Sequence, residues 1–347
     1  GGGEGGGCRG AAVMRESGDA AHERATRASR CCVYWEAMAK LRDRLHGVVG
    51  FPITPFKKDS LEVDYAALER NVAYMARFGF CSMVAAGGTG ELYSLTVEEA
   101  VEVVRVTKKV CGDRIPVIGG VGLNTPIATA MARGMEQAGA DGLLVLPPAY
   151  LNAPQQGLFD YYAAVGRASG LPLAIYSRDW AVFTPEMVAK LAEQVPTLDI
   201  WKDGQGNGRV YQRIMAHVGD RLAWVGGLGD DCLPTYLACR VQAFTSSISN
   251  TCPELAVRLA ELGGLIKNPA GEPDLKAITD LMNALVHPLY ALREKVKGYE
   301  VSVMKYMMDL LGGELYGGPV RPPLENTRPE HQAEVTRLTE LYRNWKP

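Results

Sequence analysis

The sequence lacks the features that mark several protein classes. Its 8 cysteines include no Cys-x-x-Cys pair, and its 5 histidines stand apart from one another. This scatter argues against a zinc knuckle and a disulfide framework, and it predicts reduced thiols that fill small core spaces in a cytoplasmic protein. We expect no bound metal ion and no organic cofactor.

Long apolar runs and an excess of charge are also missing. The chain of 347 residues carries 37 Lys and Arg against 39 Asp and Glu, so no overall field favours nucleic acid or an anionic membrane. No stretch is long and apolar enough to predict a transmembrane helix. The expected partners are small molecules and further copies of the chain.

Residues 1–37 lack hydrophobic periodicity and are rich in Gly, Ala, Arg and Ser, which predicts a disordered extension. A tail, an organelle presequence and a read-through of the gene model are alternative interpretations. The acidic residues Glu16, Asp19 and Glu23 argue against the presequence interpretation, because such peptides are usually poor in acidic residues. Met38 opens a helical pattern over residues 39–45.

Beyond residue 46, short apolar runs alternate with amphipathic stretches at about 26 residues per repeat, the spacing of a (β/α)8 barrel. This pattern predicts an α/β fold, a TIM barrel over residues 38–267. The predicted strands are Gly47–Ile53, Ser82–Ala86, Pro116–Gly120, Gly142–Leu146, Pro172–Tyr176, Asp199–Lys202, Ala223–Gly227 and Ala243–Ile248.

Helix starts carry regular signals. Thr96 and Glu99 form a capping box before a helix predicted over Ala100–Val110, and proline follows Thr125, Thr184 and Cys252 at the first helical turn.

From residue 268 the pattern changes to helices without intervening strands. They are predicted over Asp274–His287, Pro288–Tyr299, Val301–Leu311 and Pro329–Asn344. We interpret residues 268–347 as an α-helical subdomain packed on the barrel, because so short a segment needs a partner surface to bury its helices.

Lys202 ends the sixth predicted strand and is followed by Asp203 and Gly204. The carboxyl ends of barrel strands carry the chemistry of this fold. If Trp201 packs outward beneath the helices, strand alternation points Lys202 into the barrel, where burial lowers the pKa of its amine and frees it to attack a carbonyl. A solvated surface lysine is the alternative.

Tyr176 ends the fifth predicted strand, so its phenol is expected beside Lys202 at the same rim, where it can transfer protons during imine chemistry. A tyrosine that merely packs is the alternative.

The third element is the segment Gly87–Glu91, directly after the second strand. Its glycines and Thr89 can offer N–H groups and a hydroxyl to a carboxylate, although a simple tight turn has the same composition. It has neither the phosphate-loop nor the dinucleotide-binding spacing. For Glu91 we favour a buried structural carboxylate over a general base.

Taken together, these residues predict a 2-oxo acid held as a Schiff base, and residues 45–324 resemble the dihydrodipicolinate synthase and N-acetylneuraminate lyase superfamily. The motifs are most similar to its 5-dehydro-4-deoxyglucarate dehydratase subgroup. They are Ala85–Glu91, Leu146–Pro148, Lys202–Gly204 and Gly318–Leu324.

The resemblance implies roles for individual residues. Lys202 would be the Schiff-base lysine, Tyr176 the proton donor and acceptor, and Thr89 the hydroxyl that grips the substrate carboxylate together with Gly88. Tyr150 would reach into a neighbouring subunit's site. Synthases and lyases usually bear a hydroxyl at the position of Gly88, so a proton relay through that group is not implied here.

The rim carries further candidates. Arg178 either contacts the distal carboxylate of the substrate or pairs with Asp179. Gly229 and Ser247 are expected to line the mouth. Ser177 and Trp180 stand where the dehydratase pattern predicts asparagines, and this departure can retune the substrate.

The implied function is that of a Schiff-base lyase, a homo-oligomer of two or four subunits, that dehydrates and decarboxylates 5-dehydro-4-deoxyglucarate. Two alternatives remain open from the residues. One is a lysine-dependent aldolase or synthase acting on another 2-oxo acid, and the other is a catalytically silent barrel that binds a sugar acid.

Overall fold

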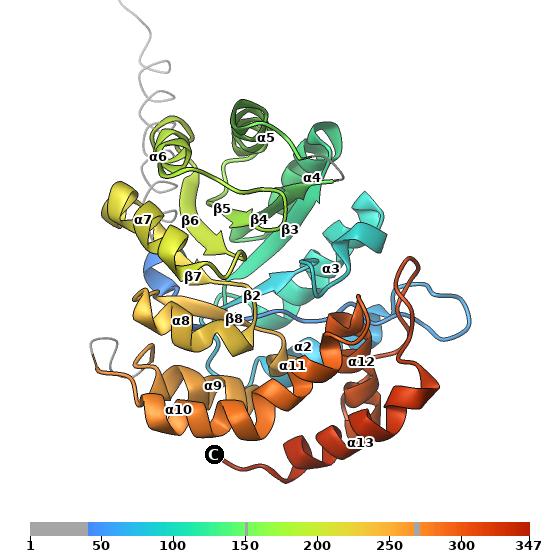
Figure 1. Ribbon diagram of the computed structural model, residues 1–347. Coiled ribbons are helices and arrows are strands. Elements are labelled where there is room, and N and C mark those ends of the chain that lie inside the picture. The colour runs from blue at the N-terminus through green and yellow to red at the C-terminus, as the bar shows by residue number, and fades with distance from the viewer. Residues whose placement is uncertain (1–40, 150–151, 267–270) are drawn as a thin grey trace, which may run out of the picture. The chain divides into compact units, whose positions relative to one another are not determined.

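A computed structural model describes residues 41–149, 152–266 and 271–347. Its strands β1 to β8 form a closed barrel in which each strand pairs in parallel with the next and β8 pairs with β1 (Figure 1). The predicted (β/α)8 barrel is therefore confirmed. The strands are β1 Gly47–Gly50, β2 Ser82–Ala85, β3 Val117–Leu123, β4 Gly142–Pro148, β5 Leu173–Ser177, β6 Leu198–Asp203, β7 Ala223–Gly226 and β8 Ala243–Ser246.

Helices follow the strands on the outside of the barrel. Their starts keep the predicted signals: the Thr96 hydroxyl accepts from the Glu99 N–H, and the Glu99 carboxylate accepts from the Thr96 N–H. These helices are α2 Tyr65–Met75, α3 Val97–Cys111, α4 Thr125–Gln137, α5 Gln155–Ala168, α6 Pro185–Gln194, α7 Gly208–Val218, α8 Leu233–Ala238 and α9 Pro253–Leu262. The short 3-10 helices are η1 Leu92–Ser94, η2 Gly219–Arg221, η3 Asp230–Cys232 and η4 Ile248–Asn250.

Some strand ends differ from the prediction. β1 ends at Gly50 rather than Ile53, since Pro52 has no N–H to offer to a ladder. β8 ends at Ser246 rather than Ile248, because Ile248 begins η4. In both places the backbone turns away from the sheet earlier than predicted.

Two apolar layers bury the strands. The interior of the barrel holds Ile200 with Leu144 and Val225, whereas Trp201 lies in the layer between strands and helices. The Trp201 ring is fully buried and meets Phe183 edge-on, with ring centres 5.0 Å apart. The predicted alternation in β6 is thus confirmed, and Lys202 falls on the interior face with Ile200.

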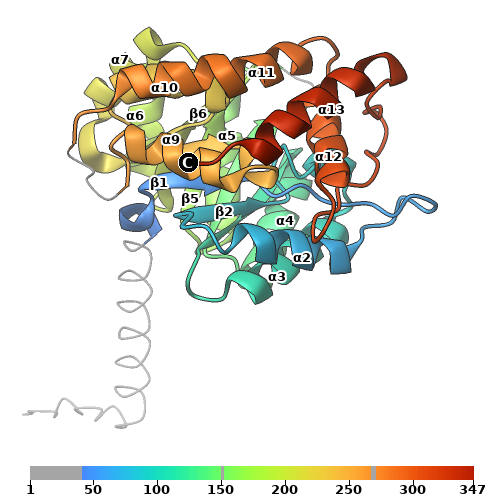
Figure 2. The same cartoon turned by 90° about the horizontal axis from the view of Figure 1, so that it is seen from below.

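The C-terminal helices cluster on one side of the barrel (Figures 1 and 2). They are α10 Leu275–Leu281, the π-helix η5 Met282–Val286, α11 His287–Arg293, α12 Tyr299–Leu311 and α13 Pro329–Asn344. The helix predicted over Pro288–Tyr299 is wrong at its end: α11 stops at Arg293, and Tyr299 opens α12. Gly298 separates the two helices with φ of 99°, a left-handed conformation that a helix cannot contain.

The predicted extension over residues 1–37, Met38 and the predicted boundary at residue 267 lie outside the described residues. Residues 41–44 are helical, and Leu41 and Leu45 pack against the apolar interior of the barrel. Within the described ranges, no helix combines the length and apolar character needed to cross a membrane.

Candidate active site

Lys202 lies at the carboxyl end of β6, with 4% of its surface exposed. Its Nζ donates a hydrogen bond to the carbonyl oxygen of Gly227 at 2.7 Å. Gly227 itself has no room for a side chain, because an added Cβ would lie 2.7 Å from this Nζ. The backbone after β7 therefore closes tightly over the amine.

Tyr176 meets the lysine at the same carbonyl. Tyr176 and Lys202 are paired residues of neighbouring strands β5 and β6. The Tyr176 hydroxyl donates to the Gly227 oxygen at 3.2 Å, and the Lys202 Nζ lies 3.0 Å from the centre of the Tyr176 ring. The amine and the phenol expected at one rim are thus brought together by a common acceptor.

Burial sets the protonation of both groups. It holds the pKa of Lys202 well below its ordinary value of 10.5, and the nearby Arg178 cation lowers it further, whereas Asp203 acts in the opposite direction. Burial raises the pKa of the Tyr176 phenol, which Arg178 opposes. Both shifts favour a free amine next to a protonated phenol, a nucleophile beside a proton donor.

Arg178 makes two contacts at this rim. Its Nη1 donates to the Tyr176 hydroxyl at 3.3 Å, and its Nε pairs with Asp179 Oδ1 at 3.2 Å. The pairing with Asp179, one of the two expected roles, is therefore present. The partly exposed guanidinium also retains N–H groups for an anion.

Gly88 and Thr89 follow β2 in a tight reversal and are both half-buried. Ala86 and Glu91, on either side of them, have left-handed φ angles of 52° and 56°. A Cβ at Gly88 would meet no atom within 4 Å, so the backbone borders open space at this point. This exposure of backbone suits the approach of a ligand.

Glu91 is buried, as expected. Its side chain is 0% exposed and forms an ion pair with Lys305 of α12, with Oε1 and Nζ 2.5 Å apart. It contacts the C-terminal region rather than Lys202 and Tyr176, so its surroundings fit a structural carboxylate.

Gly229 and Ser247 lie where the loops after β7 and β8 meet α11. The Ser247 N–H donates to Asp230 Oδ2 at 3.2 Å, and Arg293 Nη1 donates to the Ser247 hydroxyl at 2.9 Å. A Cβ at Gly229 would lie 2.8 Å from the Tyr290 hydroxyl. Ser247 is therefore engaged by a polar network that includes Arg293 of α11, and the backbone of Gly229 lies close to Tyr290 of the same helix.

The two departures from the dehydratase pattern support the loop after β5. The Ser177 hydroxyl donates to the Ala181 carbonyl at 3.0 Å, and Trp180 Nε1 donates to the Pro148 carbonyl at 2.6 Å. Tyr150 lies outside the described residues. Among those described, no group of three or more His, Cys, Asp or Glu side chains is arranged to hold a metal ion.

The structure adds residues that the sequence analysis did not identify. The Gly227 carbonyl has no side-chain signature, so no pattern could have indicated it. Lys305 does have a signal, since it is a single cation among the apolar residues of α12. Such a lysine inside an apolar helix predicts a buried partner.

A closed parallel barrel with a buried lysine and a phenol at its carboxyl rim defines an enzyme suited to imine chemistry on a carbonyl substrate. The chain belongs to the dihydrodipicolinate synthetase family, whose model matches residues 44–341, and it is a lyase.

Curated relatives are dehydratases by name. The chain is 36% identical over 294 residues to a probable 5-dehydro-4-deoxyglucarate dehydratase of Bradyrhizobium diazoefficiens, covering 84% of this chain and 90% of the relative. It is 39% identical over 295 residues to a protein of the same name from Rhodococcus opacus, covering 84% and 93%. The solved dihydrodipicolinate synthase of Bacillus clausii superposes with a TM-score of 0.80 at 26% identity, covering 87% of this chain and 99% of that one.

Proposed function

We propose that this enzyme converts 5-dehydro-4-deoxyglucarate to 2,5-dioxopentanoate, water and carbon dioxide through a Schiff base on Lys202. The observation that carries the proposal is the buried Lys202 amine, which shares the Gly227 carbonyl with the Tyr176 hydroxyl. The names of the curated relatives support the choice of substrate.

The first step forms the imine. The neutral Lys202 amine attacks the 2-oxo carbon, and water leaves after the carbinol oxygen gains a proton. Tyr176, the nearest phenol, is the group that we assign to that proton transfer. The amine and phenol are held by the same backbone oxygen, so neither has to move far to act on one carbon.

The second step uses the imine as an electron sink. Its positive charge acidifies the neighbouring methylene, and loss of a proton gives an enamine. The enamine expels the β-hydroxyl as water and becomes a conjugated iminium. Cleavage of the bond to the far carboxylate then releases carbon dioxide, and its electron pair passes into the conjugated system. Protonation and hydrolysis free the product and the amine.

Carboxylate binding would fix the substrate over the amine. We assign Gly88 and Thr89 to the carboxylate next to the oxo group, because the loop after β2 presents backbone toward open space. Arg178 is assigned to the distal carboxylate, with its remaining N–H groups. Gly229, Ser247 and Tyr150 are retained as candidate binding residues.

The direct test is reduction with borohydride during turnover. Incubation with 5-dehydro-4-deoxyglucarate should release carbon dioxide and 2,5-dioxopentanoate, and borohydride should fix an adduct on the peptide that contains Lys202. The Lys202→Met variant should give neither. Lys109→Met is the matched control, because Lys109 is an exposed lysine on α3 paired with Glu69.

Two outcomes would contradict the proposal. Release of pyruvate without carbon dioxide would identify an aldolase that uses the same imine. An equal adduct in the wild type and in Lys202→Met would exclude this lysine. A homo-oligomer of two or four subunits remains part of the proposal, and light scattering of the full chain measures it.

A further inference from the structure

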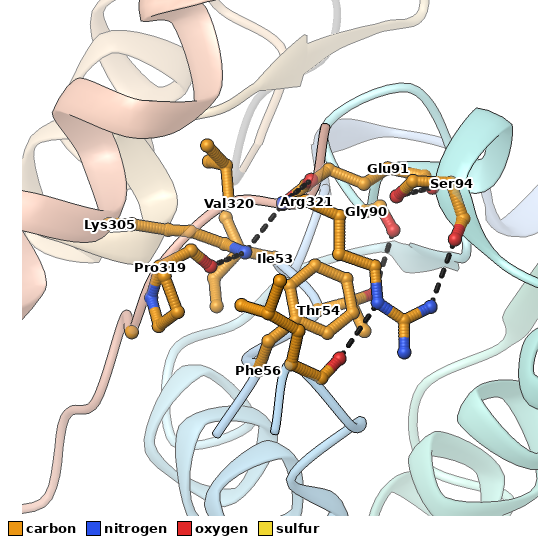
Figure 3. Close-up of polar contacts among 12 residues, drawn as sticks. Ile53, Thr54, Phe56, Gly90, Glu91, Ser94, Lys305, Pro319, Val320 and Arg321 are labelled. Atoms are coloured by element: carbon orange, nitrogen blue, oxygen red, sulfur yellow. Dashed lines mark hydrogen bonds and ion pairs between the residues drawn. The ribbon is translucent and has the colours of Figure 1, made fainter. Parts of the chain in front are cut away.

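The Gly-rich loop after β2 is tied to the C-terminal helices by one buried ion pair. Glu91 ends this loop, and Lys305 lies in the middle of α12; their side chains are 0% and 1% exposed (Figure 3). The Nζ to Oε1 distance is 2.5 Å. Segments far apart in the sequence are thus joined directly beside the proposed carboxylate site.

Further contacts fix both partners of the pair. Lys305 Nζ also donates to the Pro319 carbonyl at 2.9 Å and lies 4.2 Å from the centre of the Phe56 ring. The second oxygen of Glu91 accepts from the Arg321 N–H at 3.2 Å. Each carboxylate oxygen of Glu91 therefore contacts the C-terminal region (Figure 3).

The backbone of Glu91 in turn shapes the loop. Its N–H donates to the Gly88 carbonyl at 3.0 Å, and the N–H of the next residue, Leu92, donates to the Gly87 carbonyl at 3.1 Å. The Thr54 hydroxyl holds the Gly90 carbonyl at 2.7 Å. A change in the position of Glu91 is therefore passed to Gly87 and Gly88 through these two backbone hydrogen bonds as well as along the chain.

The conformation of Glu91 needs this support. Its φ of 56° is left-handed, a region that costs a residue with a side chain about 1 kcal/mol or more and persists only where the surroundings enforce it. A buried ion pair is also a poor source of net stability, because removing both charges from water offsets most of their attraction. The pair is better explained by the geometry that it imposes on the loop.

We propose that Glu91 and Lys305 are a positioning pair that holds Gly88 and Thr89 in place to bind the substrate carboxylate. The C-terminal helices then set the preference of the enzyme for 2-oxo acids over neutral carbonyl compounds. This inference rests on the proposed function, since it requires a Schiff base on Lys202 and carboxylate binding by the loop. Neither partner of the pair touches the substrate.

The test compares two small carbonyl probes that differ in the group beside the carbonyl carbon. Pyruvate carries a carboxylate there and hydroxyacetone a hydroxymethyl group. Rates of borohydride trapping at Lys202 are measured with each probe, for the wild type and for Glu91→Gln/Lys305→Met. The paired substitution removes both charges, keeps the side-chain volumes nearly constant and retains an acceptor for the Arg321 N–H.

The wild type should trap pyruvate faster than hydroxyacetone. The paired variant should lose about tenfold or more of the pyruvate rate, as expected when a binding group is displaced by a fraction of an ångström, and should keep its hydroxyacetone rate within about twofold. KM for the full substrate should rise more than kcat falls. Lys295→Met/Glu334→Gln removes a different ion pair of the C-terminal region, between the turn that precedes α12 and α13, and should leave the preference unchanged.

Unchanged preference for pyruvate in the paired variant would overturn the inference while leaving the proposed function intact. An equal loss with both probes would also overturn it, because a general loosening of the fold affects both alike. No trapping at Lys202 in the wild type would overturn the proposed function and this inference with it. Glu91→Gln alone provides the same comparison should the paired variant not fold.

Discussion

The Nζ of Lys202 lies 3.0 Å from the centre of the Tyr176 ring, and both side chains donate to the Gly227 carbonyl. The phenol therefore lies against the amine, held by the backbone that follows β7. This arrangement accounts for the lowered pKa of the lysine, since the ring and the barrel wall exclude water from it.

Removal of the Tyr176 phenol oxygen should distinguish the role of this side chain in packing from its role in proton transfer. Tyr176→Phe keeps the ring over Lys202 but removes the hydroxyl that donates to Gly227. We expect kcat to fall by about 10²- to 10⁴-fold, the usual contribution of a general acid or base, while the melting temperature changes little. Steady-state kinetics and thermal unfolding measure the two quantities. An unchanged kcat would remove Tyr176 from the mechanism.

Crowding of the Lys202 amine should slow imine formation without unfolding the barrel. In Gly227→Ala the new Cβ would lie 2.6 Å from Lys202 Cε and 2.7 Å from its Nζ, so the lysine side chain has to move. We expect the trapping rate to fall by about tenfold or more, because small displacements of a reacting group cost that much. Gly79→Ala, where nothing lies within 4 Å, is the control. Equal trapping by both variants would contradict the geometry.

The positive charge of Arg178 should affect the pH dependence of imine formation. Trapping of hydroxyacetone, a neutral probe, should rise with pH through the lowered pKa of Lys202 and level off well below 10.5. Because the Arg178 cation disfavours the ammonium form, Arg178→Met should raise this pKa and move the rise to higher pH. Arg77→Met, which removes an exposed cation of another salt bridge, should leave the profile in place. A shift of the rise to lower pH in Arg178→Met would contradict this effect, because it would mean that the Arg178 cation raises the pKa of Lys202.

The Glu91–Lys305 pair should behave as a strongly coupled unit in unfolding. Lys305→Met leaves the Glu91 carboxylate buried without its partner, which should cost about 3–5 kcal/mol of unfolding free energy. Glu91→Gln/Lys305→Met removes both charges and should cost much less than Lys305→Met alone. A double-mutant cycle from urea unfolding gives the coupling energy. Additive effects of the two substitutions would show that the side chains do not interact.

The same pair predicts how stability responds to alkaline pH. Burial lowers the pKa of Lys305 from 10.5 to about 8 in the folded protein. Between these values the unfolded chain holds a proton that the folded chain has released, so the unfolding free energy should rise with pH across this window. The comparison is with Glu91→Gln/Lys305→Met, in which this contribution is absent. If the unfolding free energy of the wild type, measured relative to that of the paired variant, fell as the pH rises between these two pKa values, the lowered pKa of Lys305 would be contradicted.

Much of the fold was accessible from local patterns. The apolar runs and helix caps repeat with the period of a barrel, and alternation along β6 placed Trp201 outward and Lys202 inward. Such features depend on residues close together in the sequence, so they can be predicted from the sequence alone. The predicted ends of β1, β8 and α11 were less accurate, because Pro52, η4 and Gly298 turn the backbone at points that the hydrophobic pattern does not mark.

The sequence by itself therefore determined the barrel, the strand that carries Lys202 and the neighbouring strand that carries Tyr176. Only the tertiary structure decided that the Gly227 carbonyl joins them, and that Lys305 anchors Glu91. A backbone carbonyl has no identity in the sequence, and a buried ion pair between distant segments depends on how helices pack against the barrel. Those contacts arise from packing in three dimensions, which no local spacing encodes.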